Sequence, residues 1–329
     1  MKIIFIVNSQ VRKRKKIIDQ IVDSFQNDHQ IEIWQTEFFQ HAIQFGERAI
    51  ETNPDIIVAV GGDGHINEVI NGLFAKQLRI IKGNPLLYEN LKLAPLSKVK
   101  FAFLPTGTGN DYARSFRIGP GIKKIKNRIE NLHVKHIDLG LIRFIDFDGN
   151  IEFRIFNNIT DIGIGAYVLQ RIKSMPPWLN ANIAYFYGIL STLFTFRYKR
   201  IHIETDVFNW NDEAISVAIA KGTFFGSGIG IAPQAQLTDN AFAVTIIGKV
   251  GPKEFLKYFS SLKRGEQIID PEIIYEKASM IKITSEEDKN LPVQMDGELI
   301  GTTPVEFKIL PNVLQIITEG ENNGPETQW

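Results

Sequence analysis

The chain has 329 residues, of which 44% are hydrophobic, so it is long enough for two domains and apolar enough for a sizeable core. Its 37 basic side chains balance 37 acidic ones, which argues against a protein that grips nucleic acid over a broad basic face. The absence of cysteine excludes disulfides and thiolate metal sites and fits a reducing compartment. The apolar stretch before Asn8 is too short for a signal peptide, and no run of about 18 apolar residues predicts a spanning helix. We therefore expect a soluble, cytoplasmic protein.

The first 125 residues alternate between two kinds of hydrophobic pattern. Strands are predicted at Ile3–Val7, Ile31–Trp34, Ile56–Val60 and Lys100–Leu104, and helices at Lys15–Phe25, Phe38–Ile50, Ile66–Leu78 and Tyr112–Phe116. This β-α-β-α order predicts a parallel sheet with helices on both faces.

The remainder of the chain reads as short strands bounded by Gly, Asn, Asp or Pro. The strands are expected at Ile137–Ile142, Ile151–Asn157, Ile201–Val207, Ala214–Ala220, Phe242–Ile247, Met280–Thr284, Val293–Met295, Val305–Ile309 and Val313–Thr318, with helices at Asn182–Phe196 and Pro252–Lys263. We therefore predict an α/β domain at residues 1–125, to which residues from about 314 to 329 return, and a mostly antiparallel β-sandwich domain at residues 126–313.

The stretch VAVGGDGHINEVINGL, residues 58–73, places three glycines and an aspartate between a strand and a helix. Ligands bind at such junctions in open α/β sheets, and glycines let a phosphate approach the N–H groups at a helix N-terminus. The carboxylate of Asp63 would repel phosphates unless a cation lay between them, which suggests Mg²⁺. The alternative is a tight turn with Asp63 as the helix N-cap.

A second loop, FLPTGTGNDYARSF at residues 103–116, repeats the arrangement with Gly107, Gly109 and Asn110. Thr106 and Thr108 add hydroxyl donors. Two such turns from one sheet can lie side by side and enclose a triphosphate, although they could also be two unrelated turns. Neither loop is a Walker A loop or a Gly-x-Gly-x-x-Gly fingerprint.

GGDGHINEVINGL and PTGTGNDYAR resemble the two nucleotide loops of the diacylglycerol kinase catalytic family. FNNITDIGIGA (156–166), GSGIGIAPQAQLTDNAFAV (226–244) and VQMDGELIGTTPVEFKILP (293–311) follow in the family's order, so the resemblance covers nearly the whole chain. Gly-Gly-Asp-Gly alone is less specific, since NAD kinases and phosphofructokinases resemble it there. The resemblance implies a nucleotide-binding α/β domain, a β-rich substrate domain and a cleft between them.

The resemblance also implies roles for individual residues. Asp296 matches the family's general base, with Glu298 supporting it, although Asp-Gly is equally a hairpin-turn signal. Asp239 matches an aspartate that holds a structural Mg²⁺, together with Gln236 and the carbonyl of Ala241. Asp63, Asp111 and Asp239 are expected to form one water-linked acidic network, and Asp63 is counted among the catalytic groups. The predicted ATP-binding set is Asn8, Ser9, Gly61, Gly62, Asp63, Gly64, His65, Glu68, Thr106, Gly107, Thr108, Gly109 and Asn110.

Several positions depart from the family pattern. His65 replaces a Thr or Ser, and Ser227 interrupts a triple glycine. Lys221 stands where Asn is frequent, Asn240 where Gly is common and Ala243 where Asp is common. These departures concern the second metal site and the substrate cleft.

Two segments could meet a membrane. The basic run at residues 12–16 could reach phosphates or an anionic lipid surface, or could be a solvated turn. Residues 175–200 form an aromatic stretch that ends in Arg197, Lys199 and Arg200, which suits a headgroup boundary or a helix that covers the core.

These observations favour an ATP- and Mg²⁺-dependent lipid kinase acting on diacylglycerol, peripherally associated with the membrane and without a nucleic-acid partner. By resemblance a homodimer is expected. The rivals are a soluble metabolite kinase of the NAD kinase type and a nucleotide-binding regulator that has lost turnover.

Overall fold

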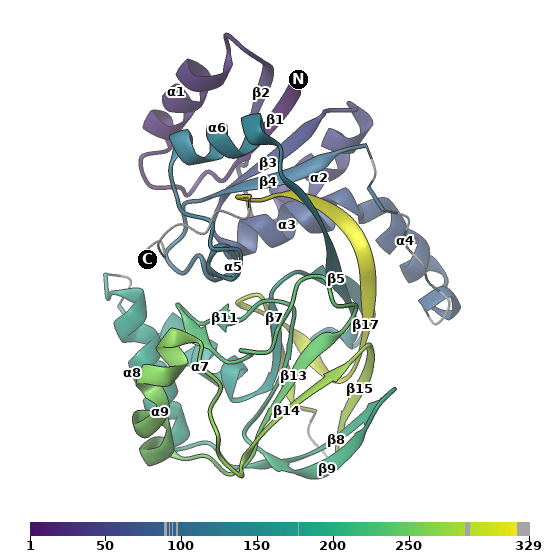
Figure 1. Cartoon of the computed structure of the whole chain (residues 1–329). Helices are drawn as coiled ribbons and strands as arrows, with labels where there is room; N and C mark the ends of the chain where they lie inside the picture. The colour runs from purple at the N-terminus through teal and green to yellow at the C-terminus, as the bar shows by residue number, and fades with distance from the viewer. Residues whose placement is uncertain are drawn as a thin grey trace. The chain divides into compact units, whose positions relative to one another are not determined.

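The structure is a computed structural model that describes residues 1–88, 91, 93, 95–96, 98–176, 178–286 and 290–320. The chain divides into two compact units. Met1–Asp138 and Pro311–Trp329 form the first, here called the α/β unit, and Leu139–Leu310 form the second, here called the β-rich unit. Two strands, β5 (Val134–Ile145) and β17 (Glu298–Ile317), pass from one unit to the other (Figure 1).

The α/β unit contains a parallel sheet in the order β2-β1-β3-β4-β17. The last strand joins through the end of β17, where Ile316 pairs with Phe101. The elements of this unit are β1 (Lys2–Val7), α1 (Arg14–Phe25), β2 (Gln30–Gln35), α2 (His41–Glu51), β3 (Ile56–Gly61), α3 (Asp63–Leu73), α4 (Ala75–Gly83), η1 (Pro85–Tyr88), β4 (Lys100–Pro105), α5 (Asp111–Ser115) and α6 (Ile122–Asn131).

Helices cover both faces of this sheet, as its sequence pattern predicted. Helices α1 and α6 lie on one face, and α2 and α3 on the other (Figure 1). Helix α6 was not predicted, and residue 125 was placed at a domain boundary. Ile125 and Ile129 of this helix are buried in one cluster with Phe5 and Phe25, so α6 belongs to the α/β unit and the division falls after Asp138.

The predicted helix boundaries shift where single residues leave the helical conformation. Helix α2 begins at His41 because Gln40 has a left-handed backbone, with φ of 63°. The helix predicted over Ile66–Leu78 is two helices, which separate at Phe74, where φ is −112°. Period alone does not detect such breaks, because the apolar spacing continues across them.

The β-rich unit is antiparallel, in the order β14-β13-β10-β7-β16-β17, and β17 also pairs with β15, which leads to β8 and β9. Its core includes Phe156, Phe242 and Phe307, whose rings stack or meet edge to face. Its elements, besides β5 and β17, are β6 (Ile151–Phe156), β7 (Ile159–Gly163), α7 (Ile164–Lys173), α8 (Ala181–Leu193), β8 (Lys199–Thr205), β9 (Asn209–Ala214), β10 (Ser216–Ala220), β11 (Phe224–Phe225), β12 (Ile229–Gly230), β13 (Phe242–Ile247), α9 (Pro252–Arg264), β14 (Ile273–Ala278), β15 (Met280–Ser285) and β16 (Pro292–Met295).

The predicted fold class, a parallel α/β part followed by an antiparallel β-rich part, is confirmed. Two details differ. The single strand predicted at Ala214–Ala220 is two strands, because the chain changes partner at Ile215. The two strands predicted on either side of Pro311 form one strand, β17. A proline, which lacks a backbone N–H, interrupts a strand only where the neighbouring strand needs a hydrogen bond from that position.

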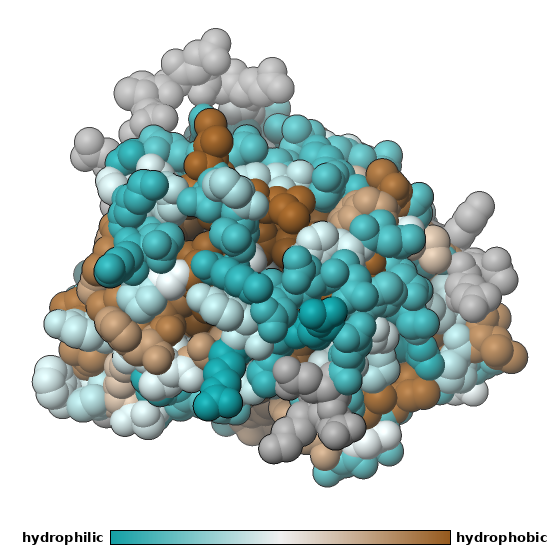
Figure 2. All heavy atoms as spheres, turned by 90° about the horizontal axis from the view of Figure 1, so that it is seen from below, coloured by the Kyte–Doolittle hydropathy of each residue, from teal (hydrophilic) through white to brown (hydrophobic). Residues whose placement is uncertain are grey.

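Helices α7, α8 and α9 pack together on the β-rich unit. Phe186 of α8 contacts Phe255 and Phe259 of α9, while the buried stripe of α8 consists of Ala184, Gly188 and Thr192. Apolar side chains lie among polar ones on the left of Figure 2, the side on which Figure 1 places these helices. Among the described residues no helix is long and apolar enough to span a membrane.

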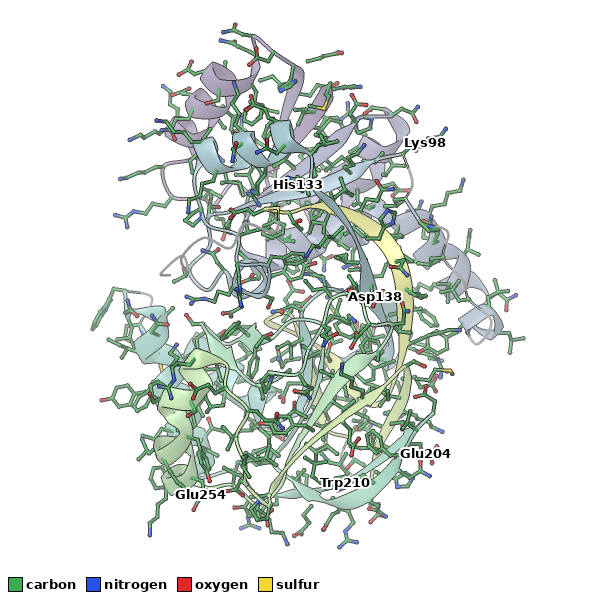
Figure 3. All side chains as sticks on the ribbon, in the orientation of Figure 1. Lys98, His133, Asp138, Glu204, Trp210 and Glu254 are labelled. Carbon is green, nitrogen blue, oxygen red and sulfur yellow. The ribbon has the colours of Figure 1, made fainter. Side chains whose placement is uncertain are left out.

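Asp138, labelled in Figure 3, is the last residue of the first segment of the α/β unit. Its carboxylate accepts a hydrogen bond of 2.9 Å from the backbone N–H of Asn312. This bond ties the departing strand β5 to the returning strand β17 where both belong to the α/β unit. The last residues of the predicted return, 321–329, lie outside the described residues.

Candidate active site

The two glycine loops of the α/β unit are in backbone contact. A Cβ atom added to Gly107 would stand 2.6 Å from the Cα of Gly62, and one added to Gly62 would stand 3.1 Å from the Cα of Gly107. Real side chains do not tolerate the first distance. The loops therefore lie side by side, as the sequence predicted. Their close packing is by itself enough to require glycine at position 107.

Asp63 joins the two loops by hydrogen bonds. It is the first residue of α3, and its carboxylate accepts the backbone N–H groups of Asp111 and Tyr112, each at 3.0 Å, in the first turn of α5. Burial raises the pKa of this carboxyl, while backbone N–H donors to it, including its own, oppose the rise. Asp63 thus caps α5 rather than its own helix. Asp63 is therefore not the N-cap of α3, which was the alternative prediction. Its carboxylate also has a structural role in addition to any binding of a cation.

Asn110 closes the second loop on itself. Its side-chain oxygen accepts the N–H of Gly107 at 2.9 Å, and its amide donates to the carbonyl of Gly107 at 2.9 Å. Asn110 has φ of 50°, a left-handed conformation that Asn tolerates. The N–H of Gly107 is therefore bonded within the loop. These two bonds make the side chain of Asn110 a loop-forming group.

The side chain of His65 packs beneath the first glycine loop, against Gly61, and bonds to the chain. The ring is buried, and Nε2 lies 2.9 Å from the carbonyl oxygen of Ile6, to which the neutral ring donates. Burial lowers the pKa of His65 to about 4. A Cβ on Gly61 would stand 2.5 Å from this ring, so Gly61 leaves room for the histidine. The expected nucleotide contact of His65 is thus limited to its backbone.

The start of α3 and two carboxylates beside it have positions that suit ligand binding at this edge. The first bond of α3 joins the N–H of Ile66 to the carbonyl of Gly62, so the helix supplies no acceptor for the N–H groups of Gly64 and His65. The carboxylates of Asp63 and Asp111 converge at Gly109, where a Cβ would lie 3.4 Å and 3.3 Å from their nearest oxygens. The three backbone donors to Asp63 still leave its carboxylate an unused acceptor direction.

The other predicted nucleotide residues surround this edge. Asn8 accepts the N–H of Gln10 through its side chain at 2.8 Å, and the N–H of Ser9 donates to Thr36. Thr108 is exposed, and Glu68 is half-buried in the second turn of α3. The Thr106 hydroxyl is buried without a partner among the described residues. Ser9 also lines a hollow of about 660 Å³. The other residues that line it are Val11, Lys13, Arg14, Lys15, Lys16 and Asp19.

In the β-rich unit, Asp296 and Gly297 form the two-residue turn between β16 and β17. Their φ angles of 47° and 88° define a type I′ turn, and Met295 pairs with Glu298 across it. The carboxylate of Asp296 accepts the N–H of Ile159 at 2.9 Å and that of Asn157 at 3.2 Å. The hairpin alternative is therefore correct as a description of the backbone, and the turn also holds a carboxylate in a fixed orientation.

Glu298 has a partner of its own. Its carboxylate lies 3.0 Å from the guanidinium of Arg154 on β6. The predicted support of Asp296 by Glu298 is therefore at most indirect. Gln294 contributes more directly, since its side-chain oxygen accepts the N–H of Gly297 at 3.1 Å and so stabilises the turn.

The predicted metal site of the β-rich unit does not fit a divalent cation. The Nζ atom of Lys221 lies 3.0 Å from Asp239 and 2.8 Å from the carbonyl of Ala241, and Lys277 binds the other oxygen of Asp239 at 2.7 Å. Gln236 is exposed. Asp63 and Asp111 belong to the other unit. Within the described residues no group of three or more His, Asp or Glu side chains could hold a metal.

Asp161 is a buried carboxyl to which the sequence analysis assigned no role, although it lies within FNNITDIGIGA. It accepts the N–H of Gly165 at 2.8 Å in the first turn of α7 and the hydroxyl of Ser216. Burial raises its pKa from 3.8 to about 6, against the opposing effect of these two donors. Asp161 therefore fixes the start of α7 beside β10.

Asp161 predicts a pH dependence of stability. Because its folded pKa is raised, its favourable contribution is complete below pH 3.8 and is lost as the pH rises through about 6. Asp161→Asn should remove this loss, so the variant gains up to about 3 kcal/mol on the wild type as the pH rises through this window. Urea unfolding measured between about pH 4 and pH 8 checks this.

Asp206→Asn is the matched control. Bonds from Ser279 and Met280 outweigh burial and lower the pKa of Asp206, so the sign is opposite and this variant should lose stability above the acid range. If the free energies of unfolding of Asp161→Asn and the wild type differed by the same amount at every pH, the assignment would be contradicted.

The comparisons agree with this combination of a two-loop α/β unit and an antiparallel β-rich unit, which defines a kinase-like fold. Residues 2–142 match the diacylglycerol kinase catalytic domain, and residues 158–318 match the YegS C-terminal NAD kinase beta sandwich-like domain. Residues 2–142 therefore belong to the diacylglycerol kinase catalytic domain family. This is a kinase family, which implies use of a nucleotide.

Individual relatives extend over the whole chain. A diacylglycerol kinase of Bacillus subtilis is 28% identical over 310 residues, which cover 93% of this chain and 92% of the relative. A crystal structure of a diacylglycerol kinase from Bacillus anthracis is 21% identical with a TM-score of 0.69 and covers 97% of both chains. A yeast NADH kinase structure shares the fold at 12% identity and a TM-score of 0.51, with coverage of 98% of this chain and 84% of that one.

Proposed function

We propose that this protein is an ATP-dependent lipid kinase that transfers the γ-phosphate to a lipid hydroxyl, with diacylglycerol as substrate and phosphatidic acid as product. The pair of glycine loops joined through Asp63 carries the proposal. Their contact at Gly62 and Gly107 brings two strand-to-helix turns together at one edge of the sheet. Such an edge is where anionic ligands bind in α/β folds.

The nucleotide phosphates are held by the α/β unit. The N–H groups of Gly64 and His65 at the start of α3 are available for them, and the lysines and Arg14 around the hollow beside Ser9 supply positive charge. Asp63 and Asp111 are the residues that would hold Mg²⁺, because both carboxylates converge at Gly109. A bound Mg²⁺ would neutralise phosphate charge during transfer.

The acceptor is activated by the β-rich unit. Asp296 takes the proton from the lipid hydroxyl as its oxygen forms a bond to the γ-phosphorus, and the bond from that phosphorus to the bridging oxygen of ADP breaks. Two backbone N–H groups hold the carboxylate of Asp296 and limit its rotation. Such fixed orientation favours proton transfer in a defined direction.

The lipid is reached at the membrane surface, and α8 is the part of the chain proposed to meet it. Apart from residue 177, which lies outside the described residues, the segment from residue 175 to 200 both covers α7 and α9 and exposes large side chains. Trp178 is 82% exposed, Phe194 73% and Tyr187 57%. Arg171, Arg197 and Lys199 line a hollow of about 500 Å³ together with the aromatic residues Tyr167 and Phe196. Aromatic rings next to cations suit the headgroup boundary of an anionic membrane.

The test is phosphate transfer from labelled ATP with Mg²⁺ to vesicles that contain diacylglycerol, beside vesicles with other lipid alcohols and beside NAD. Label in phosphatidic acid supports the proposal. Label in another lipid keeps the lipid-kinase mechanism and changes the substrate, whereas label only in NAD identifies a metabolite kinase. Bound ATP without transfer to any acceptor identifies a nucleotide-binding regulator.

Two glycines separate packing from phosphate binding. A Cβ at Gly64 meets nothing within 4 Å, so Gly64→Ala should leave the melting temperature unchanged or slightly raised. If a phosphate approaches this backbone, the methyl group blocks it and ATP binds about tenfold or more weakly by calorimetry. Gly107→Ala should instead lower the melting temperature, because its Cβ meets Gly62. Unchanged ATP affinity in Gly64→Ala would remove the phosphate from the start of α3.

A further inference from the structure

Lys221 is a buried lysine at the end of β10. Its side chain has no exposed surface, whereas that of Asp239 is 16% exposed. A charged lysine is almost never fully buried unless it is paired. Its Nζ donates to Asp239 at 3.0 Å and to the carbonyl of Ala241 at 2.8 Å. The ammonium thus joins a carboxylate and a backbone carbonyl in the loop that leads into β13.

These two acceptors are the ones that were expected to bind a divalent cation. Their distances to Nζ are those of N–H···O hydrogen bonds, and an ammonium offers three donors to oxygen acceptors. Mg²⁺ would instead need near-octahedral oxygens at about 2.0–2.1 Å. The space that a cation would take between Asp239 and Ala241 is therefore filled by a group of this chain.

The charges around Asp239 also oppose a metal. Lys277 binds the second oxygen of Asp239 at 2.7 Å, so two ammonium groups surround a single carboxylate. Position 243, beside this site, carries an alanine that pairs across the sheet with Ala220, the residue before Lys221. A divalent cation here would meet two positive charges and one negative charge, which is unfavourable in a partly buried site.

The backbone of the loop suits this arrangement. Asn240, between Asp239 and Ala241, has φ of 56°, a left-handed conformation that Asn adopts more readily than most residues. The departures at Lys221, Asn240 and Ala243 therefore belong together. Lys221 adds an ammonium to the site, Ala243 leaves it without a second carboxylate, and Asn240 keeps the left-handed turn.

We propose that the ammonium group of Lys221 takes the place of a structural divalent cation in the β-rich unit. The segment from Asp239 to Ala241 is then held by the chain itself, and the β-rich unit needs no metal for its stability. This inference concerns the β-rich unit alone and does not depend on the substrate that is phosphorylated.

The first test asks whether the wild-type protein binds a metal at this site. Its melting temperature, measured without nucleotide, should be the same with EDTA as with excess MgCl₂. Crystals soaked in MnCl₂ should show no anomalous peak between Asp239 and Ala241. An anomalous peak there would overturn the proposal. So would a wild-type protein that EDTA destabilises and that binds Mn²⁺ at Asp239.

The second test removes the ammonium. Lys221→Met keeps an unbranched side chain of similar length but leaves the carbonyl of Ala241 and one oxygen of Asp239 without this donor, and the melting temperature should fall by roughly 5–10 °C. Lys277→Met is the matched control, because Lys277 binds the same carboxylate but its side chain is 41% exposed, so its loss should be clearly smaller. Equal losses in the two variants, or none in Lys221→Met, would contradict a special role for Lys221.

The third test asks whether a cation and the ammonium are equivalent. Lys221→Ala opens space between Asp239 and Ala241, so excess MgCl₂ or MnCl₂ should recover part of the lost melting temperature. Lys277→Ala should show no such recovery, since Lys221 still fills the site. A Lys221→Ala protein that folds but gains nothing from either cation would contradict the equivalence.

Discussion

Replacing Asp296 by Asn should lower phosphate transfer by about 10²–10⁴-fold while leaving ATP binding intact, because the variant loses the group that accepts the proton. The fold should survive. Asn tolerates the φ of 47° at this position, and Asn-Gly is favoured in a type I′ turn. Rates with saturating lipid, ATP affinity by calorimetry and the melting temperature measured on one preparation check the three parts of this prediction.

Glu298→Gln provides the matched control for Asp296. It changes a carboxylate two residues away and weakens the ion pair with Arg154, but it leaves the two backbone donors of Asp296 in place. We expect a loss of no more than about tenfold, since the effect reaches the base only through the turn. Near-equal losses in the two variants would make Glu298 a direct participant in the reaction. A rate for Asp296→Asn close to that of the wild type would exclude Asp296 as the base.

Removing the carboxylate of Asp63 is expected to have the second large effect, this time on both stability and nucleotide binding. In Asp63→Ala the N–H groups of Asp111 and Tyr112 lose their acceptor, and each unsatisfied buried donor costs about 1–3 kcal/mol. Asp63→Asn keeps one acceptor oxygen and should lose about half as much. The loosened loops should then bind ATP at least tenfold more weakly in Asp63→Ala.

Unfolding in urea and ATP titration, each with and without Mg²⁺, measure this series. Asp28→Asn is a suitable control because its carboxylate is exposed and paired with Lys126, and the loss of such a solvent-screened ion pair should change stability little. If Asp63 acted only as a cation ligand, both variants would keep wild-type stability without Mg²⁺, and the joining of the two loops would have no energetic importance.

Much of the fold followed from local pattern. The alternation of apolar runs predicted the parallel sheet, and the Gly-rich junctions at residues 61–64 and 107–109 predicted that two loops would meet at one edge. These features depend on side-chain period and on glycine, which act over a few residues. Helix α6 was missed because four of its ten residues are basic, and one of these, Arg128, is itself buried beside Ile125 and Ile129 and so interrupts the apolar pattern.

The roles of single polar groups were less accessible. Asp63, Asn110 and His65 were all assigned to the nucleotide, yet their side chains bond to backbone groups of Tyr112, Gly107 and Ile6. A motif specifies which residue type stands at a position, but not whether its polar atoms are directed to a ligand or to the chain. That choice depends on partners that are distant in sequence.

The sequence by itself determined the class of fold, the order of the two units, the two glycine loops and the turn at Asp296, because backbone conformation and hydrophobic period are encoded locally. Only the tertiary structure decided that Asp63 bonds across to α5, that Asp161 is buried at the start of α7, and that the ammonium of Lys221 lies between Asp239 and Ala241. A buried polar group must be satisfied by whatever donor or acceptor packing brings near it, and packing is a property of the folded chain.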